Sequence, residues 1–130
     1  LFPLEMDYVL EEVILTPSLF NPAACRKNLE RTIREQMVFF AEMDGICAAK
    51  AGTNALGFNT VQIGGVYTLP DLRGRGIAMK LMTMLLHKIF EDKHTVSLFV
   101  KKGNNPAVGL YKKLGFSIID NFRILYYGKV

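Results

Sequence analysis

The spacing of apolar residues predicts an alternation of strands and helices along most of the chain. Apolar positions at helical spacing predict helices over residues 22–35 and 74–90, and a third helix that opens at 103–106 and ends near Gly115. Runs of β-prone apolar residues predict the strands, at residues 37–41, 46–51, 60–68, 96–100, 116–119 and 122–127. The order of these elements predicts an α/β fold with a mixed, mostly antiparallel sheet flanked by helices.

Turn residues set most of the predicted boundaries. Asp44-Gly45 lies between two apolar runs and predicts a hairpin, and Asp120-Asn121 predicts a closing one. Asn21-Pro22 predicts the start of a helix. The glycine pair Gly64-Gly65 inside a strand indicates a bulge or a close approach of another group. Residues 53–59 are expected to form a connection, and the first 20 residues give no clear pattern.

The helical spacing also predicts which side chains are buried. In the long helix the predicted core face is Ile77, Leu81, Met84, Leu85 and Ile89. In the helix over residues 22–35 the predicted face is Ala24, Leu29 and Ile33.

Composition narrows the class of protein. The 130 residues, half of them hydrophobic with a mean hydropathy of +0.19, predict one ordered domain over residues 1–130. No apolar run is long enough to span a bilayer, and Cys25 and Cys47 predict reduced thiols in a cytoplasmic protein. The chain begins at Leu1, so we expect it to be the C-terminal part of a longer bacterial protein. Whether the chain forms a homodimer is left open.

Lys and Arg exceed Asp and Glu by 16 to 12, which suits either a nucleic acid or a polyphosphate cofactor. The basic residues gather around the glycine-rich turn at residues 73–76 and around the downstream helix rather than among exposed aromatic residues, which argues against a nucleic acid. The few His and Cys residues have no metal-ligand spacing, so no metal site is predicted.

A strand, a glycine-rich turn and a helix form the arrangement that binds phosphate through free backbone N–H groups. The turn reads Arg-Gly-Arg-Gly at residues 73–76. It lacks the Gly-Lys-Ser/Thr of a P-loop. A dinucleotide-binding turn would need a third glycine where Met79 stands and an acidic residue where Lys101 and Lys102 stand.

Two longer runs resemble the GNAT superfamily of N-acetyltransferases. Residues 66–78 (VYTLPDLRGRGIA) resemble its acyl-CoA motif, [Q/R]-x-x-G-x-[G/A] after a strand, and residues 104–116 (NNPAVGLYKKLGF) resemble its downstream N-x-x-A-x-x-L-Y-x-x-x-G-F motif. The resemblance covers residues 37–127 best. It implies a parallel strand pair, 60–68 and 96–100, that splays apart around the cofactor.

The resemblance also implies the residues that bind acetyl-CoA. The pyrophosphate would lie on the backbone of the turn, and the pantetheine arm would meet the strand backbone at Tyr67 and Thr68. Asn104 would bind the cofactor from the opposite side, and Tyr111 would be the general acid that protonates the departing CoA thiolate. The residues of the turn are Arg73, Gly74, Arg75, Gly76, Ile77 and Ala78.

These assignments predict an acyl-CoA-dependent N-acetyltransferase acting on an amine, by direct attack in a ternary complex. The general base is not assigned, because Gln62 stands where many members of the family have a carboxylate and an amide does not abstract protons. Glu11, Glu12, Glu42 or Asp44 acting through water, or an amine that arrives neutral, stay open. The alternative function is a CoA-binding sensor or interaction module without turnover.

Overall fold

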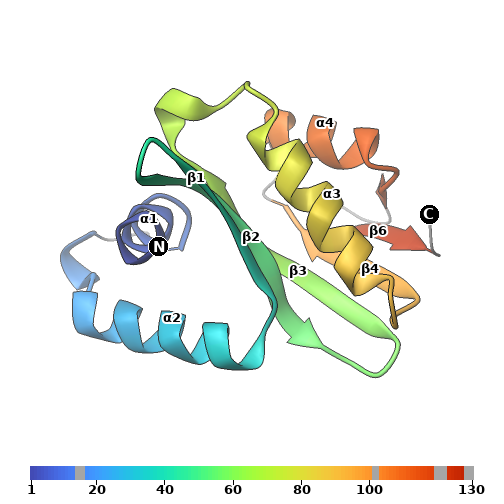
Figure 1. Ribbon diagram of the computed structural model, residues 1–130, viewed down its shortest axis with the longest axis horizontal. Helices are drawn as coiled ribbons and strands as arrows, with labels where there is room; N and C mark the ends of the chain where they lie inside the picture. Colours follow the sequence, from blue (N-terminus) through green and yellow to red (C-terminus); the bar gives the residue numbers. More distant parts are fainter. Residues whose placement is uncertain (14–16, 101–102, 119–122, 128–130) are drawn as a thin grey trace.

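The chain folds around a six-stranded sheet, described here in a computed structural model that covers residues 1–13, 17–100, 103–118 and 123–127. The strand order is β1-β2-β3-β4-β6-β5. Among the described strands, only the neighbours β3 and β4 run parallel; the other pairs are antiparallel. Figure 1 shows α1 and α2 on one side of β1, β2 and β3, with α3 on the other side. The predicted mixed, mostly antiparallel sheet with one parallel pair is confirmed.

The described strands and helices have the following bounds. The strands are β1 (Val38–Met43), β2 (Ile46–Leu56), β3 (Thr60–Thr68), β4 (Thr95–Phe99), β5 (Ser117–Ile118) and β6 (Arg123–Tyr127). The helices are α1 (Phe2–Tyr8), α2 (Pro22–Glu35), α3 (Ile77–Ile89) and α4 (Asn105–Lys113). The turn predicted at Asp120-Asn121 lies outside the described residues.

Local signals placed several boundaries correctly. Strand β3 and helix α2 have the predicted bounds. Asn21 caps α2, because its side-chain oxygen accepts hydrogen bonds from the N–H groups of Ala23 and Ala24 at 3.0 and 3.2 Å. Gly45 has a φ of +77° in the β1–β2 turn, a backbone conformation that glycine adopts without a Cβ clash.

Strand β2 is longer than predicted, and the expected connection over residues 53–59 is wrong for its first part. The strand continues to Leu56 because β3 pairs with it as far as Leu56 opposite Val61. Thr53 is buried there, and its hydroxyl donates a 2.8 Å hydrogen bond to the Gln36 side chain and accepts one from the N–H of Met37 at 3.0 Å. These long-range contacts offset the low β propensity of the segment.

The N-terminal residues that showed no pattern form helical structure against β2. After α1, Val9–Val13 form a π-helical turn and Pro17–Leu19 form a 3-10 turn. Leu4 of α1 is 2% exposed, and α1 contacts both α2 and β2. Such short helices form through tertiary packing rather than intrinsic propensity, so the sequence alone gave little sign of them.

The core lies between α3 and the sheet, where it also receives Tyr111 from α4. The predicted face of α3 is right at Leu81, Leu85 and Ile89, but Met84 is 56% exposed. Met82 and Leu86 are buried instead, so the buried stripe is wider and rotated toward them. On α2, Leu29 is buried as predicted, whereas Ala24 and Ile33 are exposed and Cys25 is buried.

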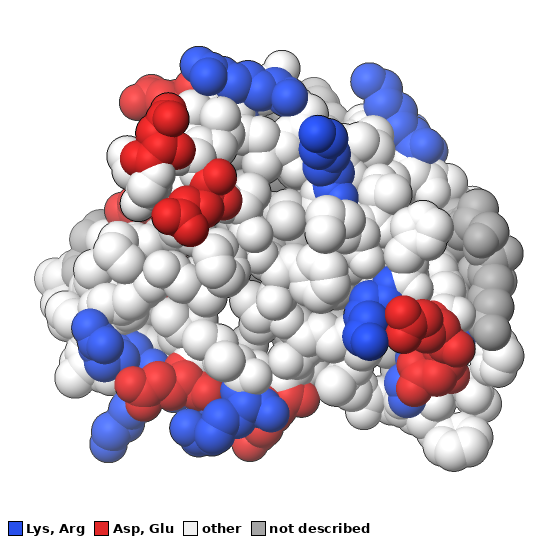
Figure 2. Space-filling model, in the orientation of Figure 1, with Lys and Arg blue, Asp and Glu red and all other residues white. Residues whose placement is uncertain are grey.

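Charges of both signs occupy the surface. In Figure 2, Lys and Arg side chains alternate with Asp and Glu over α2 at the lower left, without a continuous basic area on that face. Among the described helices, none has the length and apolar character needed to cross a membrane.

Candidate functional site

The central feature of the site is the point where β3 and β4 stop pairing. Their last paired residues are Ile63 and Leu98, while β3 continues to Thr68. Just after that point β3 contains a bulge: Gly52 of β2 is opposite Gly64, but Lys50 is opposite Tyr67, so two residues of β3 oppose one of β2. The backbone of residues 64–68 therefore has no β4 partner in the described sheet, and its edge is available to a ligand.

The bulge confirms what the glycine pair indicated. Gly65 has a φ of +67°, which strongly favours glycine. A Cβ at Gly64 would lie 2.2 Å from the Asn54 side-chain nitrogen, and a Cβ at Gly65 would lie 2.7 Å from Nζ of Lys50. Both glycines thus allow polar side chains of β2 to approach the β3 backbone.

The open strand leads through a short 3-10 turn (Pro70–Leu72) into the glycine-rich loop before α3. Gly74 and Gly76 both have a φ of +79°, and a Cβ on either would meet no atom within 4 Å. Gly76 is the N-cap of α3 and no side chain caps the helix. The loop therefore leaves room for an anion at a helix N-terminus.

Backbone donors are available at the start of α3. The first helical hydrogen bond runs from the N–H of Lys80 to the carbonyl of Gly76 at 3.1 Å. Among the described residues, the N–H groups of Ile77, Ala78 and Met79 have no recorded acceptor. Such free donors at the positive end of a helix are the usual means of binding phosphate. The chemistry predicted for the turn therefore fits its geometry.

The two arginines of the loop have different surroundings. Arg73 donates from Nε to the carbonyl of Thr68 at 2.9 Å, and its Nη2 lies 2.7 Å from the carboxylate of Glu11. Its guanidinium also lies 5.3 Å from the centre of the Tyr67 ring. Arg75 is exposed and has no recorded ion pair within the described part of the chain. Arg73 therefore fixes the loop to the N-terminal segment, whereas Arg75 is the loop arginine without an ion pair among the described residues.

Tyr67 and Asn104 each have a structural role beside the predicted one. The Tyr67 ring packs edge-on against Tyr8, with centroids 5.7 Å apart, and burial raises the pKa of its phenol. Because the ring packs against Tyr8, the backbone of Tyr67 is the part left for a ligand where β3 and β4 stop pairing, beyond Ile63 and Leu98. Asn104 caps α4, its side-chain oxygen accepting from the N–H of Ala107 at 3.3 Å, so its NH₂ group is the part left to reach a cofactor.

Tyr111 lies on α4 and is 6% exposed. Its ring packs against Phe116 with centroids 5.8 Å apart, within the same core cluster as Leu81 and Met82 of α3. The ring is thus packed within the core, which is what a positioned proton donor needs and what a core tyrosine also shows. Its role as general acid stays a prediction.

The candidate bases are not gathered at the site. Glu11 is engaged by Arg73, whereas Glu42 and Asp44 are exposed at the β1–β2 hairpin, and the side chain of Glu12 lies outside the described residues. Gln62 is opposite Ser97 of β4, one residue before the last β3–β4 pair. The amide thus lies next to the gap, where the carboxylate of other family members would be expected.

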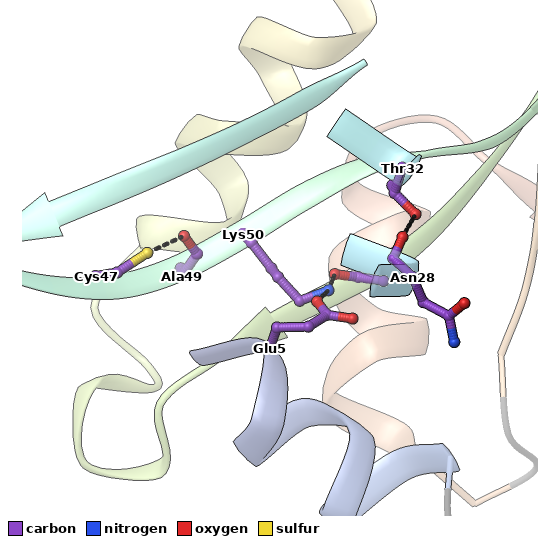
Figure 3. A network of polar contacts seen from close by, with 7 residues as sticks. Glu5, Asn28, Thr32, Cys47, Ala49 and Lys50 are labelled. Carbon is purple, nitrogen blue, oxygen red and sulfur yellow. Dashed lines mark hydrogen bonds and ion pairs between the residues drawn. The ribbon is translucent and has the colours of Figure 1, made fainter. Parts of the chain in front are cut away.

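Sequence reasoning missed a buried ion pair beside the bulge. Lys50, 7% exposed, lies 3.0 Å from the carboxylate of Glu5 and donates to the carbonyl of Gly65 at 2.7 Å (Figure 3). Its Nζ is also 3.8 Å from the centre of the Tyr8 ring. Burial lowers the pKa of Lys50, and the carboxylate of Glu5 opposes that effect. The available signal was a single lysine within the apolar run of residues 47–51.

A pocket lies next to this ion pair, between α1 and α2. Its volume is about 320 Å³. Glu5, Tyr8, Asn21 and Cys25 are among the residues that line it. Within the described part of the chain, no three His, Cys, Asp or Glu side chains are grouped so that they could hold a metal ion.

Comparison with known proteins identifies the family. The sequence profile of the acetyltransferase (GNAT) family matches residues 8–116. The mycothiol acetyltransferase of Corynebacterium aurimucosum is 41% identical over 68 residues, which are 48% of this chain and 22% of that protein. That of Pseudarthrobacter chlorophenolicus is 33% identical over 90 residues, or 58% of this chain and 28% of that protein. The matches thus span less than a third of these relatives.

Solved structures share the fold at low identity. The structure of PH1933 from Pyrococcus horikoshii has a TM-score of 0.82 at 17% identity and covers 99% of this chain and 91% of that one. A GNAT superfamily phosphinothricin acetyltransferase from Sinorhizobium meliloti, solved in complex with AcCoA, has a TM-score of 0.79 at 15% identity, covering 98% and 80%. The chain belongs to the GNAT acetyltransferase family.

Proposed function

We propose that this domain transfers an acetyl group from acetyl-CoA to an amine. The observation that carries the proposal is the continuous backbone surface from the unpaired part of β3, residues 64–68, to the two left-handed glycines and the free N–H groups of α3. An extended amide-containing arm that ends in a pyrophosphate matches this surface, because the strand edge binds amides and the helix N-terminus binds phosphate.

Each part of the site has a separate task in this reaction. The loop backbone at Gly74, Gly76, Ile77 and Ala78 holds the pyrophosphate, and the edge of β3 at Tyr67 and Thr68 aligns the pantetheine arm. N–H groups near the bulge stabilise the negative charge that develops on the thioester oxygen as the amine attacks. Tyr111 supplies a proton to the departing thiolate, while Asn104 holds the arm from α4.

The amine attacks the thioester directly in a ternary complex. A route through an acylated enzyme would need an activated nucleophile. Burial raises the pKa of both the Cys25 and the Cys47 thiols, and neutral thiols are poor nucleophiles. The C–N bond forms first and moves an electron pair onto the thioester oxygen. When this tetrahedral intermediate collapses, the C–S bond breaks; in total the amine loses one proton and the thiolate gains one.

The pKa of the acetyl acceptor should determine how the reaction rate depends on pH. The reason is that an amide, Gln62, stands at the position of the expected base, so the amine has to lose its proton before it attacks. We expect kcat/KM to rise with pH and to level off near the pKa of the acceptor amine itself. The measurement compares two acceptors whose amine pKa values differ by roughly two units or more, such as a peptide α-amino group (about 8) and a lysine side chain (about 10.4). A common midpoint for both acceptors would instead indicate a base on the protein.

Arg75 is expected to add charge to the phosphate site. Arg75→Ala should weaken CoA binding by about 1–2 kcal/mol, the size of one charge-assisted hydrogen bond, and the loss should shrink as salt is added. Isothermal titration calorimetry at two salt concentrations measures both effects. Arg34→Ala, an exposed arginine at the end of α2, is the control. Equal losses in the two variants would indicate a general effect of net charge, and no loss for Arg75→Ala at low salt would move the role to Arg73, Lys80 or Lys112.

Turnover is the direct test of the proposed function. The protein is incubated with acetyl-CoA and a panel of polyamines, amino acids, aminoglycosides and peptides with free N-termini, and the release of free CoA thiol is followed. Release that depends on one class of amine supports the proposal. Tight binding of acetyl-CoA without release for any amine would favour the alternative, a CoA-binding sensor.

A further inference from the structure

Lys50 carries a buried charge that packing alone does not explain. Its side chain leaves β2 toward α1 and ends between Glu5 and the β3 backbone (Figure 3). Removing an ammonium group from water is costly, and an apolar side chain of similar volume often replaces a buried ion pair without loss of stability. The contacts that need an ammonium here are the ion pair with Glu5, the hydrogen bond to the carbonyl of Gly65 and the contact with the face of the Tyr8 ring.

The carbonyl that Lys50 holds belongs to the bulge. Gly65 lies two residues beyond Ile63, the last residue of β3 that pairs with β4. Its left-handed φ of +67° is a conformation that a flexible glycine leaves easily unless other groups fix it. The hydrogen bond from Nζ at 2.7 Å is one such group.

Fixing the Gly65 carbonyl also fixes the direction of a backbone hydrogen-bond donor, the N–H of Val66. The peptide unit between Gly65 and Val66 is planar and trans, so its C=O and N–H point in opposite directions. When Lys50 holds the oxygen toward α1, the N–H of Val66 points the opposite way within the same peptide plane. The direction of a backbone donor next to the opening between β3 and β4 thus depends on a side chain of β2.

We propose that Lys50 is a positioning residue for acetyl transfer: it holds the Gly65 carbonyl, and through it the bulge whose backbone N–H groups face the thioester. Glu5 has a supporting role, because its side-chain oxygen accepts from the ammonium on the other side and so helps to direct it at that carbonyl. The inference rests on the proposed function. Its structural part, that Lys50 fixes the backbone of the bulge, can be measured separately from turnover.

The test compares three variants. Lys50→Met keeps the length of the side chain and removes the hydrogen-bond donor, whereas Lys50→Arg keeps a charged donor. The control is Lys88→Met, which removes a lysine of α3 that forms an exposed ion pair with Glu91. We expect kcat to fall about tenfold or more in Lys50→Met, as for a small displacement of a reacting geometry, while the Kd for CoA changes less than about threefold. Lys50→Arg should recover part of the lost kcat, and Lys88→Met should behave as the unmodified protein.

Amide NMR spectra of the same proteins report on the bulge without turnover. The Gly65 and Val66 signals should move in Lys50→Met and stay in Lys88→Met. Unmoved signals, or an unchanged kcat in Lys50→Met, would overturn the inference. If the unmodified protein releases no CoA with any amine, the proposed function fails, and unmoved signals would still refute the hold on the bulge.

A further variant covers the case in which Lys50→Met does not fold. Glu5→Gln leaves Lys50 and its bond to Gly65 in place and removes only the charge of its partner. We expect kcat within about threefold of the unmodified protein, because the carbonyl is still held. A tenfold loss in Glu5→Gln with unmoved Gly65 and Val66 signals would show that the ion pair, not the hold on the bulge, matters, and would overturn the inference.

Discussion

We expect Gly76→Asp to abolish binding of acetyl-CoA and to leave the domain folded. Gly76 is the N-cap of α3, with free N–H groups immediately after it and open space where a Cβ would stand. An aspartate there places a carboxylate where the pyrophosphate would lie, so it both fills the space and repels the anion. The same carboxylate interacts favourably with the positive end of α3, so the helix itself should persist.

The control for this variant separates strain from charge. Gly45 has a φ of +77°, close to the +79° of Gly76, and a Cβ there also meets no atom within 4 Å. Gly45→Asp therefore has the same left-handed backbone cost, about 1–2 kcal/mol, in the β1–β2 turn rather than at a helix N-terminus. Calorimetry should find wild-type affinity for acetyl-CoA in Gly45→Asp and none in Gly76→Asp. Retained affinity in a folded Gly76→Asp would mean that the loop is not the phosphate site.

Tyr111→Phe separates catalysis from binding. The substitution keeps the ring that packs against Phe116 and removes only the phenolic hydroxyl group. If that proton goes to the departing thiolate, kcat should fall by about 10²-fold or more while the affinity for acetyl-CoA changes little. The value of kcat/KM should fall in parallel, because the interaction exists chiefly in the transition state.

The measurements for Tyr111 are steady-state kinetics, calorimetry and thermal unfolding of the two proteins. Tyr111 is 6% exposed, so loss of its hydroxyl can lower stability by leaving a partner unsatisfied, by about 1–3 kcal/mol. A lower melting temperature with normal turnover would make Tyr111 a core residue only. Normal kcat in a folded Tyr111→Phe would remove it from the mechanism and leave acetyl transfer resting on the loop and the open strand.

The family comparison and the structure support different parts of these predictions. The match over residues 8–116 establishes the family, and structures at 15–17% identity establish the fold. The tasks of individual residues rest on their surroundings in this chain. Arg73 shows why this matters, since its sequence position suggested a phosphate ligand whereas its guanidinium binds Glu11 and the carbonyl of Thr68.

The sequence by itself determined the elements that local chemistry specifies. Glycines at residues 45, 65, 74 and 76 indicated turns, a bulge and an anion-binding loop, and each has positive φ in the structure. The Asn21-Pro22 pair marked the start of α2. Such signals are readable because the required backbone conformation or cap depends on one or two neighbouring residues.

Only the tertiary structure decided the features that depend on distant partners. The extension of β2 to Leu56, the burial of Met82 in place of Met84 and the helical N-terminal segment all follow from packing against other elements. The pairing of Lys50 with Glu5 and Gly65 joins residues 45 and 15 positions apart in the chain. A local sequence pattern does not indicate such a contact, because the energy of the contact arises only when folding brings the partners together and excludes water.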